Sequence, residues 1–313
     1  MTRTLGRSGI EVRPLAFGGN VFGWTADAPT SYRLLDAFVD AGFNFIDTAD
    51  AYSFWIPGNK GGESETIIGD WLAQRPGMRA KVVIGTKLGV EITPGEKGTS
   101  RAYMMTAVER SLKRLKTDYI DLYWSHRDDE ETPMEETLSS FAELIKAGKV
   151  RTIGASNFSA GRLSQALKVS ADNGLPRYEA LQNEYNLYTR ADFEAELQGL
   201  CRREEIANVP FFGLASGFLT GKYRTEKDLE GSARAYRVKD MLNPRGLAIL
   251  AALDAVGAAH GATPAQIALA WLAAKDAIPI ASATSLDQLK DLMAFVDIKL
   301  TAEDVAGLDA ASA

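Results

Sequence analysis

The stretch GFNFIDTADAYS, residues 42–53, decides the fold that this sequence predicts. Its apolar run, residues 43–46, ends in Asp47, and Tyr52 follows five residues later in a predicted loop. A short apolar run bounded by such residues is typical of a buried strand. A strand that delivers a carboxylate and then a phenol to one edge of a domain indicates a reaction site rather than a packed core.

On both sides of this stretch, short strand-like runs alternate with amphipathic helical runs. The predicted strands are residues 15–18, 44–47, 82–87, 120–124, 150–156, 180–184, 208–212 and 278–281. The predicted helices are residues 30–41, 63–73, 102–115, 133–147, 160–173, 191–205, a helical region after about 243, and 286–295. Alternation of this kind implies parallel strands joined by helical crossovers. Eight such units over residues 1–313 predict a single-domain α/β protein, a (β/α)8 TIM barrel, with a short β-hairpin at residues 2–12 ahead of it.

The glycines after the first barrel strand argue against an open nucleotide-binding sheet. They fall at positions 18, 19 and 23 and lack the G-x-G-x-x-G spacing that such a sheet carries after its first strand. A Rossmann domain is therefore disfavoured.

Composition narrows the class of protein further. The 313 residues include 35 basic and 41 acidic side chains, a net charge of −6, which argues against a nucleic-acid partner. No apolar run approaches the roughly 20 residues that span a bilayer, and the N-terminus lacks the apolar core of a signal peptide, so we expect a cytoplasmic protein without a membrane partner. With one cysteine, two histidines and no Cys/His cluster, neither a disulfide nor a metal site is expected.

Two more polar residues join Asp47 and Tyr52. Lys87 and His126 follow the next two predicted strands, and the carboxyl ends of barrel strands open on one face, so all four converge there. A lysine ammonium is expected to lower the pKa of a neighbouring phenol, and an aspartate holds the lysine in place. Tyr52 can then protonate an oxygen that becomes an alkoxide, while His126 orients the carbonyl. This is carbonyl reduction, and it needs an external hydride donor.

Each of these residues also has a structural interpretation. Asp47 can cap a loop, Tyr52 can pack its ring in a loop, Lys87 can reach solvent from a strand end, and His126 can be an interior histidine. Lysine is rarely buried without a partner, however, and four structural roles would have to hold together. The joint pattern favours function.

The motif resembles the signature of the aldo-keto reductase family, G-x-x-x-[FI]-D-T-A-x-x-Y, and the resemblance extends over nearly the whole chain. It implies reversible, NAD(P)H-dependent reduction of an aldehyde or ketone to an alcohol, with Tyr52 as general acid and Lys87, Asp47 and His126 completing the catalytic set.

The resemblance also implies a cofactor site in three segments. The nicotinamide end would meet Ser156, Asn157 and Gln182, with Phe211 stacked on the ring. The phosphates would be lined by Leu214, Ser216, Gly217, Leu219 and Lys222. The adenosine end would meet Ser282, Ala283, Thr284, Gln288 and Asp291.

Charge around residue 222 agrees with an anionic ligand there, although a solvated loop would explain it equally well. Six basic residues stand against three acidic ones between positions 222 and 239, namely Lys222, Arg224, Lys227, Arg234, Arg237 and Lys239. The family implies NADP(H) rather than NAD(H). Residues 282–284, Ser-Ala-Thr, nevertheless lack the Lys or Arg that strongly NADP-selective members carry there.

Aromatic residues near the catalytic face are candidate walls of the substrate pocket, with loop packing as the alternative. The predicted pocket residues are Asn20, Trp24, Phe54, Trp55 and Trp124. The partner is a small carbonyl or alcohol whose identity, like the oligomeric state and the direction of the reaction, the sequence does not specify.

Two other functions are weighed against the reductase. One is a cofactor-binding redox sensor or regulatory subunit of the potassium-channel β-subunit type, against which we note no additional N-terminal segment for engaging a partner. The other is a metal-dependent barrel hydrolase, for which the sequence lacks a ligand cluster.

Overall fold

The computed structural model describes residues 2–231 and 235–313, and these contain a ring of parallel strands. The strands of the ring are β3 (Ala16–Gly18), β4 (Phe45–Asp47), β5 (Val83–Leu88), β6 (Ile120–Ser125), β7 (Val150–Ser156), β8 (Tyr178–Gln182), β9 (Ala207–Asn208) and β10 (Ile280–Ala281). They lie in the order β10-β3-β4-β5-β6-β7-β8-β9, and each neighbouring pair is parallel. The predicted (β/α)8 barrel is confirmed.

Residues next to β10 close the ring. The backbone nitrogen of Ile278 donates to the carbonyl oxygen of Asn208 at 2.8 Å, and that of Ile280 donates to Pro210 at 3.0 Å. On the other side, β10 pairs with β3. The last strand therefore bonds to both the first and the seventh strands, which leaves little open edge.

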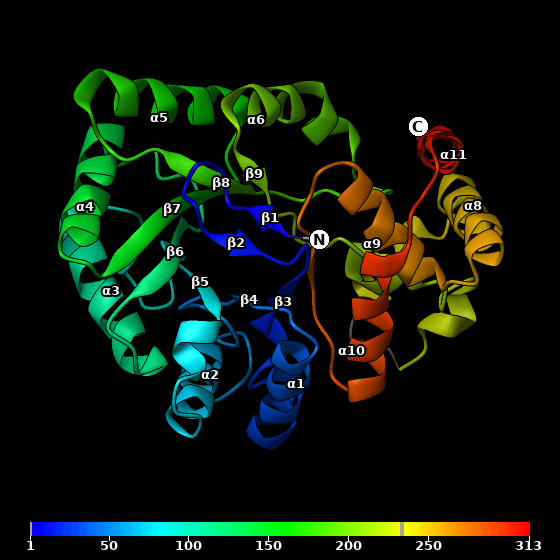
Figure 1. The fold of residues 1–313 in the computed structure, drawn as a ribbon, viewed down its shortest axis with the longest axis horizontal. Coiled ribbons are helices and arrows are strands. Elements are labelled where there is room, and N and C mark those ends of the chain that lie inside the picture. The colour runs from blue at the N-terminus through cyan, green and yellow to red at the C-terminus, as the bar shows by residue number, and fades with distance from the viewer. Residues whose placement is uncertain (1, 232–234) are drawn as a thin grey trace.

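Helices form an outer ring around the strands (Figure 1). They are α1 (Ala28–Asp40), α2 (Glu63–Ala73), α3 (Arg101–Leu115), α4 (Met134–Lys146), α5 (Ala160–Asn173), α6 (Gln198–Glu204), α7 (Ala235–Val238), α8 (Pro244–His260), α9 (Pro264–Ala274), α10 (Leu286–Met293) and α11 (Ala302–Ala311). The predicted helix 191–205 is divided, because a π-helical turn, Phe193–Leu197, precedes α6. Helix α11 was not predicted.

Local sequence signals explain where several helices begin. The Asp27 carboxylate accepts a hydrogen bond from the Thr30 backbone nitrogen at the start of α1. At the start of α9, Thr263 and Gln266 form a capping box, with Pro264 in the first turn. These caps satisfy backbone N–H groups that have no partner inside the helix.

The N-terminal hairpin covers one opening of the barrel, in front of the strands in Figure 1. It pairs β1 (Arg3–Thr4) with β2 (Glu11–Val12), as predicted. Three of its apolar side chains, Leu5, Ile10 and Val12, are buried with residues inside the barrel. The hairpin meets Asn44, just before β4, so it seals the end at which the strands begin and leaves the opposite end for the site.

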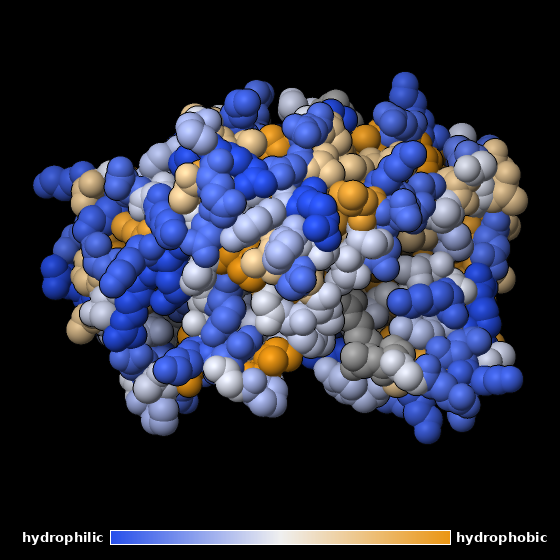
Figure 2. All heavy atoms as spheres, turned by 90° about the horizontal axis from the view of Figure 1, so that it is seen from below, coloured by the Kyte–Doolittle hydropathy of each residue, from blue (hydrophilic) through white to orange (hydrophobic). Residues whose placement is uncertain are grey.

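One face of the molecule has a mostly polar surface. The face that contains α1, α2 and α10 is largely hydrophilic, with hydrophobic residues in small groups (Figure 2). In the described parts of the chain no single helix is both long and apolar enough to cross a bilayer. Helices α8 and α9 reach that length and composition only as a pair, and they meet at 91°.

Candidate active site

The four predicted catalytic residues meet at the carboxyl ends of three adjacent strands. Asp47 is the last residue of β4, Lys87 lies near the end of β5, and His126 directly follows β6. Tyr52 returns from the loop after β4. Strand register therefore places together side chains that are up to 79 positions apart, from residue 47 to residue 126.

Lys87 is the centre of this cluster, and its side chain is fully buried. Its Nζ donates hydrogen bonds to Asp47 Oδ2 at 2.6 Å, to the Thr48 carbonyl oxygen at 2.7 Å and to Tyr52 Oη at 2.8 Å. All three donors of an ammonium group are thereby used. The cluster is a buried ion pair with a phenol attached to its cation.

The protonation of the cluster differs in one respect from the sequence prediction. Burial raises the pKa of Tyr52 well above its usual range, and the neighbouring Asp47 carboxylate raises it further. The predicted lowering of the Tyr52 pKa is therefore wrong for this site. Burial lowers the pKa of Lys87, against the opposing effect of Asp47. The phenol carries its proton at neutral pH, as a proton donor must.

His126 lies beside the phenol as a neutral group. Its ring centroid is 6.1 Å from that of Tyr52, with the rings at 76°. Burial lowers the pKa of His126 well below its usual value, and Lys87 and Arg127 lower it further. Its Nδ1 is buried without a hydrogen-bond partner among the described residues. A neutral imidazole keeps one N–H group, which can donate a hydrogen bond to a carbonyl oxygen.

The three residues predicted for the nicotinamide end form a connected network beside this cluster. Ser156 Oγ donates to the Gln182 carbonyl oxygen at 2.8 Å, and Asn157 Nδ2 donates to the His126 carbonyl oxygen at 2.9 Å. Gln182 Nε2 donates to Asp47 Oδ1 at 3.0 Å. This last contact was not predicted, and it gives the second oxygen of the Asp47 carboxylate a partner.

The segment predicted for the phosphates has an unusual backbone. It includes the 3-10 helix η4 (Ala215–Thr220), in which Ala215, Ser216 and Gly217 have φ of 47°, 58° and 95°. Left-handed conformations in successive residues turn N–H groups toward one side and form anion-binding concavities. A Cβ at Gly217 would lie 3.7 Å from Lys222 Nζ, so an ammonium is adjacent. These features fit a diphosphate, while Leu214 and Leu219 flank the same turn.

The basic residues after this turn have separate roles. Arg224 forms an ion pair with Asp254 at 2.8 Å, on the outside of the barrel. The Arg237 guanidinium lies 4.9 Å from the ring centroid of Phe212, the neighbour of the predicted stacking residue Phe211. Phe211 itself is partly exposed. Arg234 lies outside the described residues.

At the predicted adenosine end, most side chains bond to the protein. Ser282 Oγ contacts the Gly18 carbonyl oxygen and Asn20 Oδ1, both at 2.7 Å. Gln288 Oε1 accepts from the Thr284 nitrogen at 2.9 Å. Asp291 accepts from Gln266 Nε2, also at 2.9 Å. Helix α10 begins immediately after Ser285, so its N-terminus faces this loop and can receive an anion.

The predicted pocket residues separate into two groups. Trp24 and Trp55 are in edge contact at 5.8 Å between centroids, and Trp55 also contacts Phe54 at 5.8 Å and Tyr52 at 6.3 Å. These rings form an aromatic rim beside the phenol. Trp55 and Phe54 are 42% and 40% exposed, so the rim is accessible.

Trp124, another predicted pocket residue, is placed differently from the prediction. It is fully buried inside the barrel, where Gly154 leaves room for its ring because an added Cβ would lie 2.3 Å away. It cannot be an accessible wall. Asn20, which follows β3, accepts a hydrogen bond from Ser282 Oγ at 2.7 Å, and its place in the pocket stays a prediction.

Two polar groups of the site were missed. The Thr48 carbonyl oxygen accepts from Lys87, a backbone contact for which the sequence carries no signal. Asp50 is 4% exposed although its side chain is ionisable and it lies within the motif itself, and its position between Asp47 and Tyr52 was a usable signal. In residues 2–231 and 235–313, no group of three His, Cys, Asp or Glu side chains is arranged to hold a metal ion.

Comparison with known proteins agrees with this geometry. The model of the aldo/keto reductase family matches residues 14–313, and the chain belongs to that family. An uncharacterized oxidoreductase of Bacillus subtilis, YrpG, is 34% identical, with 96% of this chain and 92% of that protein aligned. A probable voltage-gated potassium channel subunit beta of rice is 33% identical, covering 98% and 95%. An aryl-alcohol dehydrogenase of Pestalotiopsis microspora is 31% identical, covering 96% and 79%. Family membership, together with the relatives named as an oxidoreductase and a dehydrogenase, indicates that the chain is an oxidoreductase.

Proposed function

We propose that this protein is a cytoplasmic NAD(P)H-dependent reductase that converts an aldehyde or ketone to an alcohol, with Tyr52 as the general acid. The observation that carries the proposal is the contact of one buried ammonium, Lys87, with both Asp47 and Tyr52 at the open end of the barrel. Lysine is almost never fully buried unless it is paired, and here one of its three partners is a phenol. The family membership of the chain supports the same reaction class.

The roles follow from the contacts. Tyr52 holds a proton at neutral pH and gives it to the carbonyl oxygen as negative charge develops there. The Lys87 ammonium, 2.8 Å from the phenol oxygen, stabilises the phenolate that remains. Asp47 keeps Lys87 charged, and His126 directs the carbonyl oxygen toward Tyr52 by hydrogen bonding.

The hydride is supplied by the nicotinamide cofactor when it is bound. We propose that Ser156, Asn157 and Gln182 hold its carboxamide, that Phe211 stacks on its ring, and that the turn at residues 214–219 with Lys222 binds its diphosphate. The left-handed backbone at Ser216 and Gly217 supports this assignment. We propose NADP(H) over NAD(H), with the start of α10 receiving the 2′-phosphate.

The aromatic rim supports a flat substrate. Trp24, Phe54 and Trp55 present ring faces and edges next to Tyr52, which favours an aryl aldehyde or ketone over a small aliphatic one. Relatives named as an aryl-alcohol dehydrogenase and as a norsolorinic acid reductase agree with this choice.

The test is the Tyr52→Phe variant, which removes a proton donor and keeps the ring. We expect turnover of an aryl aldehyde, followed at 340 nm with NADPH, to fall by about 10² to 10⁴-fold. Dissociation constants for NADPH and NADH, measured by tryptophan quenching, should stay within about twofold of the unmodified protein. Tyr119→Phe is the control, because Tyr119 packs under Arg79 away from the site and should leave turnover intact. Turnover that survives Tyr52→Phe would refute the role of Tyr52.

A second candidate function is a cofactor-binding regulatory subunit. Its support is the 33% identity to the rice protein named as a probable potassium channel subunit beta. Tight binding of nucleotide with negligible turnover across a panel of aldehydes and ketones would favour this function over the reductase.

A further inference from the structure

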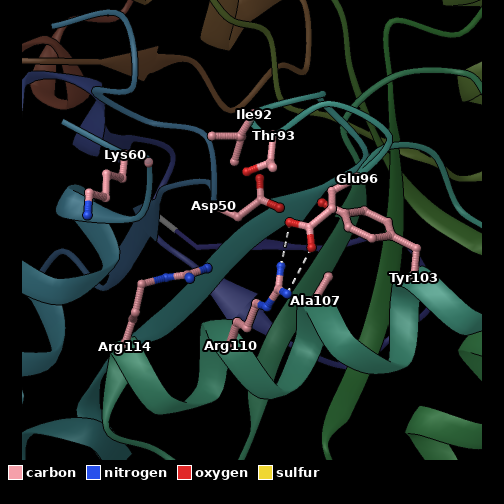
Figure 3. A pocket seen from close by; sticks show the side chains of 10 residues that line it. Asp50, Lys60, Ile92, Thr93, Glu96, Tyr103, Ala107, Arg110 and Arg114 are labelled. Carbon is pink, nitrogen blue, oxygen red and sulfur yellow. Dashed lines mark hydrogen bonds and ion pairs between the residues drawn. The ribbon is translucent and has the colours of Figure 1, made fainter. Parts of the chain in front are cut away.

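A pocket is lined by the loop after β4, which carries Asp50, but by none of the four candidate catalytic residues. Its volume is about 80 Å³, and its lining includes Asp50, Lys60, Ile92, Tyr103, Arg110 and Arg114. In Figure 3 the side chains of Asp50, Arg110 and Arg114 point toward one another from the loop after β4 and helix α3, with Ile92 of the loop after β5 beside them, while the Lys60 side chain points away. The pocket is therefore built by the loops that follow two strands of the proposed active site, together with one helix, α3.

Asp50 joins this pocket to Lys87. Its backbone nitrogen donates to the Lys87 carbonyl oxygen at 3.2 Å, so the loop is fixed to the end of β5. Its side chain lines the pocket and is buried, and its Oδ1 has no hydrogen-bond partner among the described residues. A buried carboxyl oxygen without a partner is costly unless the group has a use or is neutral.

The other acidic groups near the pocket are paired. Glu65 of α2 is fully buried and accepts from Thr86 Oγ1 at 2.5 Å and from Arg114 Nε at 2.6 Å. Glu96 forms two bonds to Arg110, at 2.7 and 3.0 Å. Within the described residues, no cation lies within ion-pair distance of Asp50. Of these three carboxyl groups, Asp50 is therefore the one whose charge is not held by an ion pair.

The charges around Asp50 act on it in opposite directions. Burial raises the pKa of Asp50 well above its usual range, and the Glu65 carboxylate raises it further, while Arg114 and Lys87 oppose this. An ionised Asp50 acts on Lys87 in turn. Burial lowers the Lys87 pKa, and both Asp47 and Asp50 raise it. Tyr123 of β6 and Tyr103 of α3 are the other titratable groups that respond to the Asp50 charge.

We propose that Asp50 is a positioning residue for Lys87: its backbone fixes the strand end that carries the lysine, and its carboxyl supplies a second, titratable negative charge that acts on the ammonium. This rests on the proposed reductase function. When Asp50 is protonated, Asp47 alone balances Lys87. When Asp50 ionises, at higher pH, it keeps Lys87 charged and so extends activity toward alkaline pH.

The experiment compares Asp50→Asn with the unmodified protein in profiles of kcat against pH. The amide keeps the shape of the side chain and removes the charge. We expect the two profiles to coincide at the acid end and the alkaline limb of the variant to move down by about 0.5 to 1 pH unit. Glu96→Gln, which removes a carboxylate already paired with Arg110 in the same pocket, is the control and should leave the profile in place.

Two results would overturn the proposal. Profiles that coincide over the whole range would mean that the Asp50 charge does not reach Lys87. A loss of kcat by the same factor at every pH would mean a purely structural role. Asp50→Ser also removes the charge and must give the same alkaline shift, so the test does not depend on the folding of one variant.

A stability measurement separates this proposal from the proposed function. Folding raises the Asp50 pKa, so the contribution of Asp50 to the free energy of unfolding is present at low pH and is lost as pH rises through the folded-state pKa. The Asp50→Asn variant should not show this pH-dependent loss of stability. In a background that carries Asp47→Asn and Lys87→Met, the loss should end about 0.5 pH unit higher, because the opposing cation is gone and the folded-state pKa of Asp50 rises, while its unfolded-state pKa stays the same. If the midpoint of this stability loss lies at the same pH in both backgrounds, the proposal is overturned, even if the protein reduces no carbonyl compound. Absence of turnover by itself refutes only the reductase function.

Discussion

Replacing Asp47 by asparagine tests whether the cluster at the barrel mouth is a charged pair. The substitution keeps the size and polarity of the side chain and removes its charge. Lys87 Nζ is 2.6 Å from Asp47 Oδ2, and the two side chains are 0% and 1% exposed. The variant therefore leaves a buried ammonium with hydrogen-bond acceptors but without its ion-pair partner.

The magnitude follows from this burial. Removing one partner of a buried ion pair costs about 3 to 5 kcal/mol of unfolding free energy, because the remaining charge has lost its solvation and its partner. For a chain of 313 residues, roughly 1.5 °C of midpoint temperature corresponds to each kcal/mol, so the expected decrease is about 5 to 8 °C. Replacing both members, as Asp47→Asn with Lys87→Met, should recover most of this loss, since no lone charge remains.

The assay is urea unfolding followed by tryptophan fluorescence and circular dichroism. Asp172→Asn is the matched control, because Lys168 Nζ and Asp172 Oδ2 are also 2.6 Å apart but the side chains are 73% and 56% exposed. That change should cost less than about 0.5 kcal/mol. A loss of only about 1 kcal/mol or less in Asp47→Asn would refute the reasoning, since Lys87 would then be neutral in the folded protein.

Two further predictions concern packing and pH. Gly69→Ala should destabilise the protein by about 3 kcal/mol or more, because the added Cβ would lie 2.0 Å from the Arg114 carbonyl oxygen where α2 meets α3. Gly307→Ala in α11, where nothing lies within 4 Å, should instead stabilise by about 0.5 to 1 kcal/mol; similar effects of the two changes on chemical unfolding would count against this contact. Because folding lowers the His126 pKa, stability should decline as pH falls below the usual histidine value, and His126→Asn should make unfolding midpoints less sensitive to acid between about pH 6.5 and 5. An unchanged acid sensitivity in that variant would contradict the burial of a neutral His126.

Much of the barrel could be read from the sequence, because each strand and helix carries its own periodic pattern. The starts of α2 and α5 and the ends of β4 and β7 fall where predicted. Weakly patterned elements were harder to predict. The two-residue strands β9 and β10 depend on pairing with distant segments, and α11 has little amphipathic character by which it could be recognised.

The site divides in the same way. The convergence of Asp47, Tyr52, Lys87 and His126 could be predicted because strand ends in a parallel barrel share one face, so it follows from the order of elements. The Trp124 position was not predictable in this way, since its burial depends on space left by Gly154 on the neighbouring strand.

The sequence by itself determined the barrel and the family and indicated the candidate catalytic residues, since these depend on local patterns and on the succession of strands. Only the tertiary structure decided the electrostatics: that the phenol pKa rises, that Gln182 supports Asp47, and that Asp50 lines a separate pocket. The physical reason is that burial and charge–charge distance are set by contacts between segments far apart in the chain. The 135 positions between Asp47 and Gln182 carry no local signal of the 3.0 Å that separates their side chains.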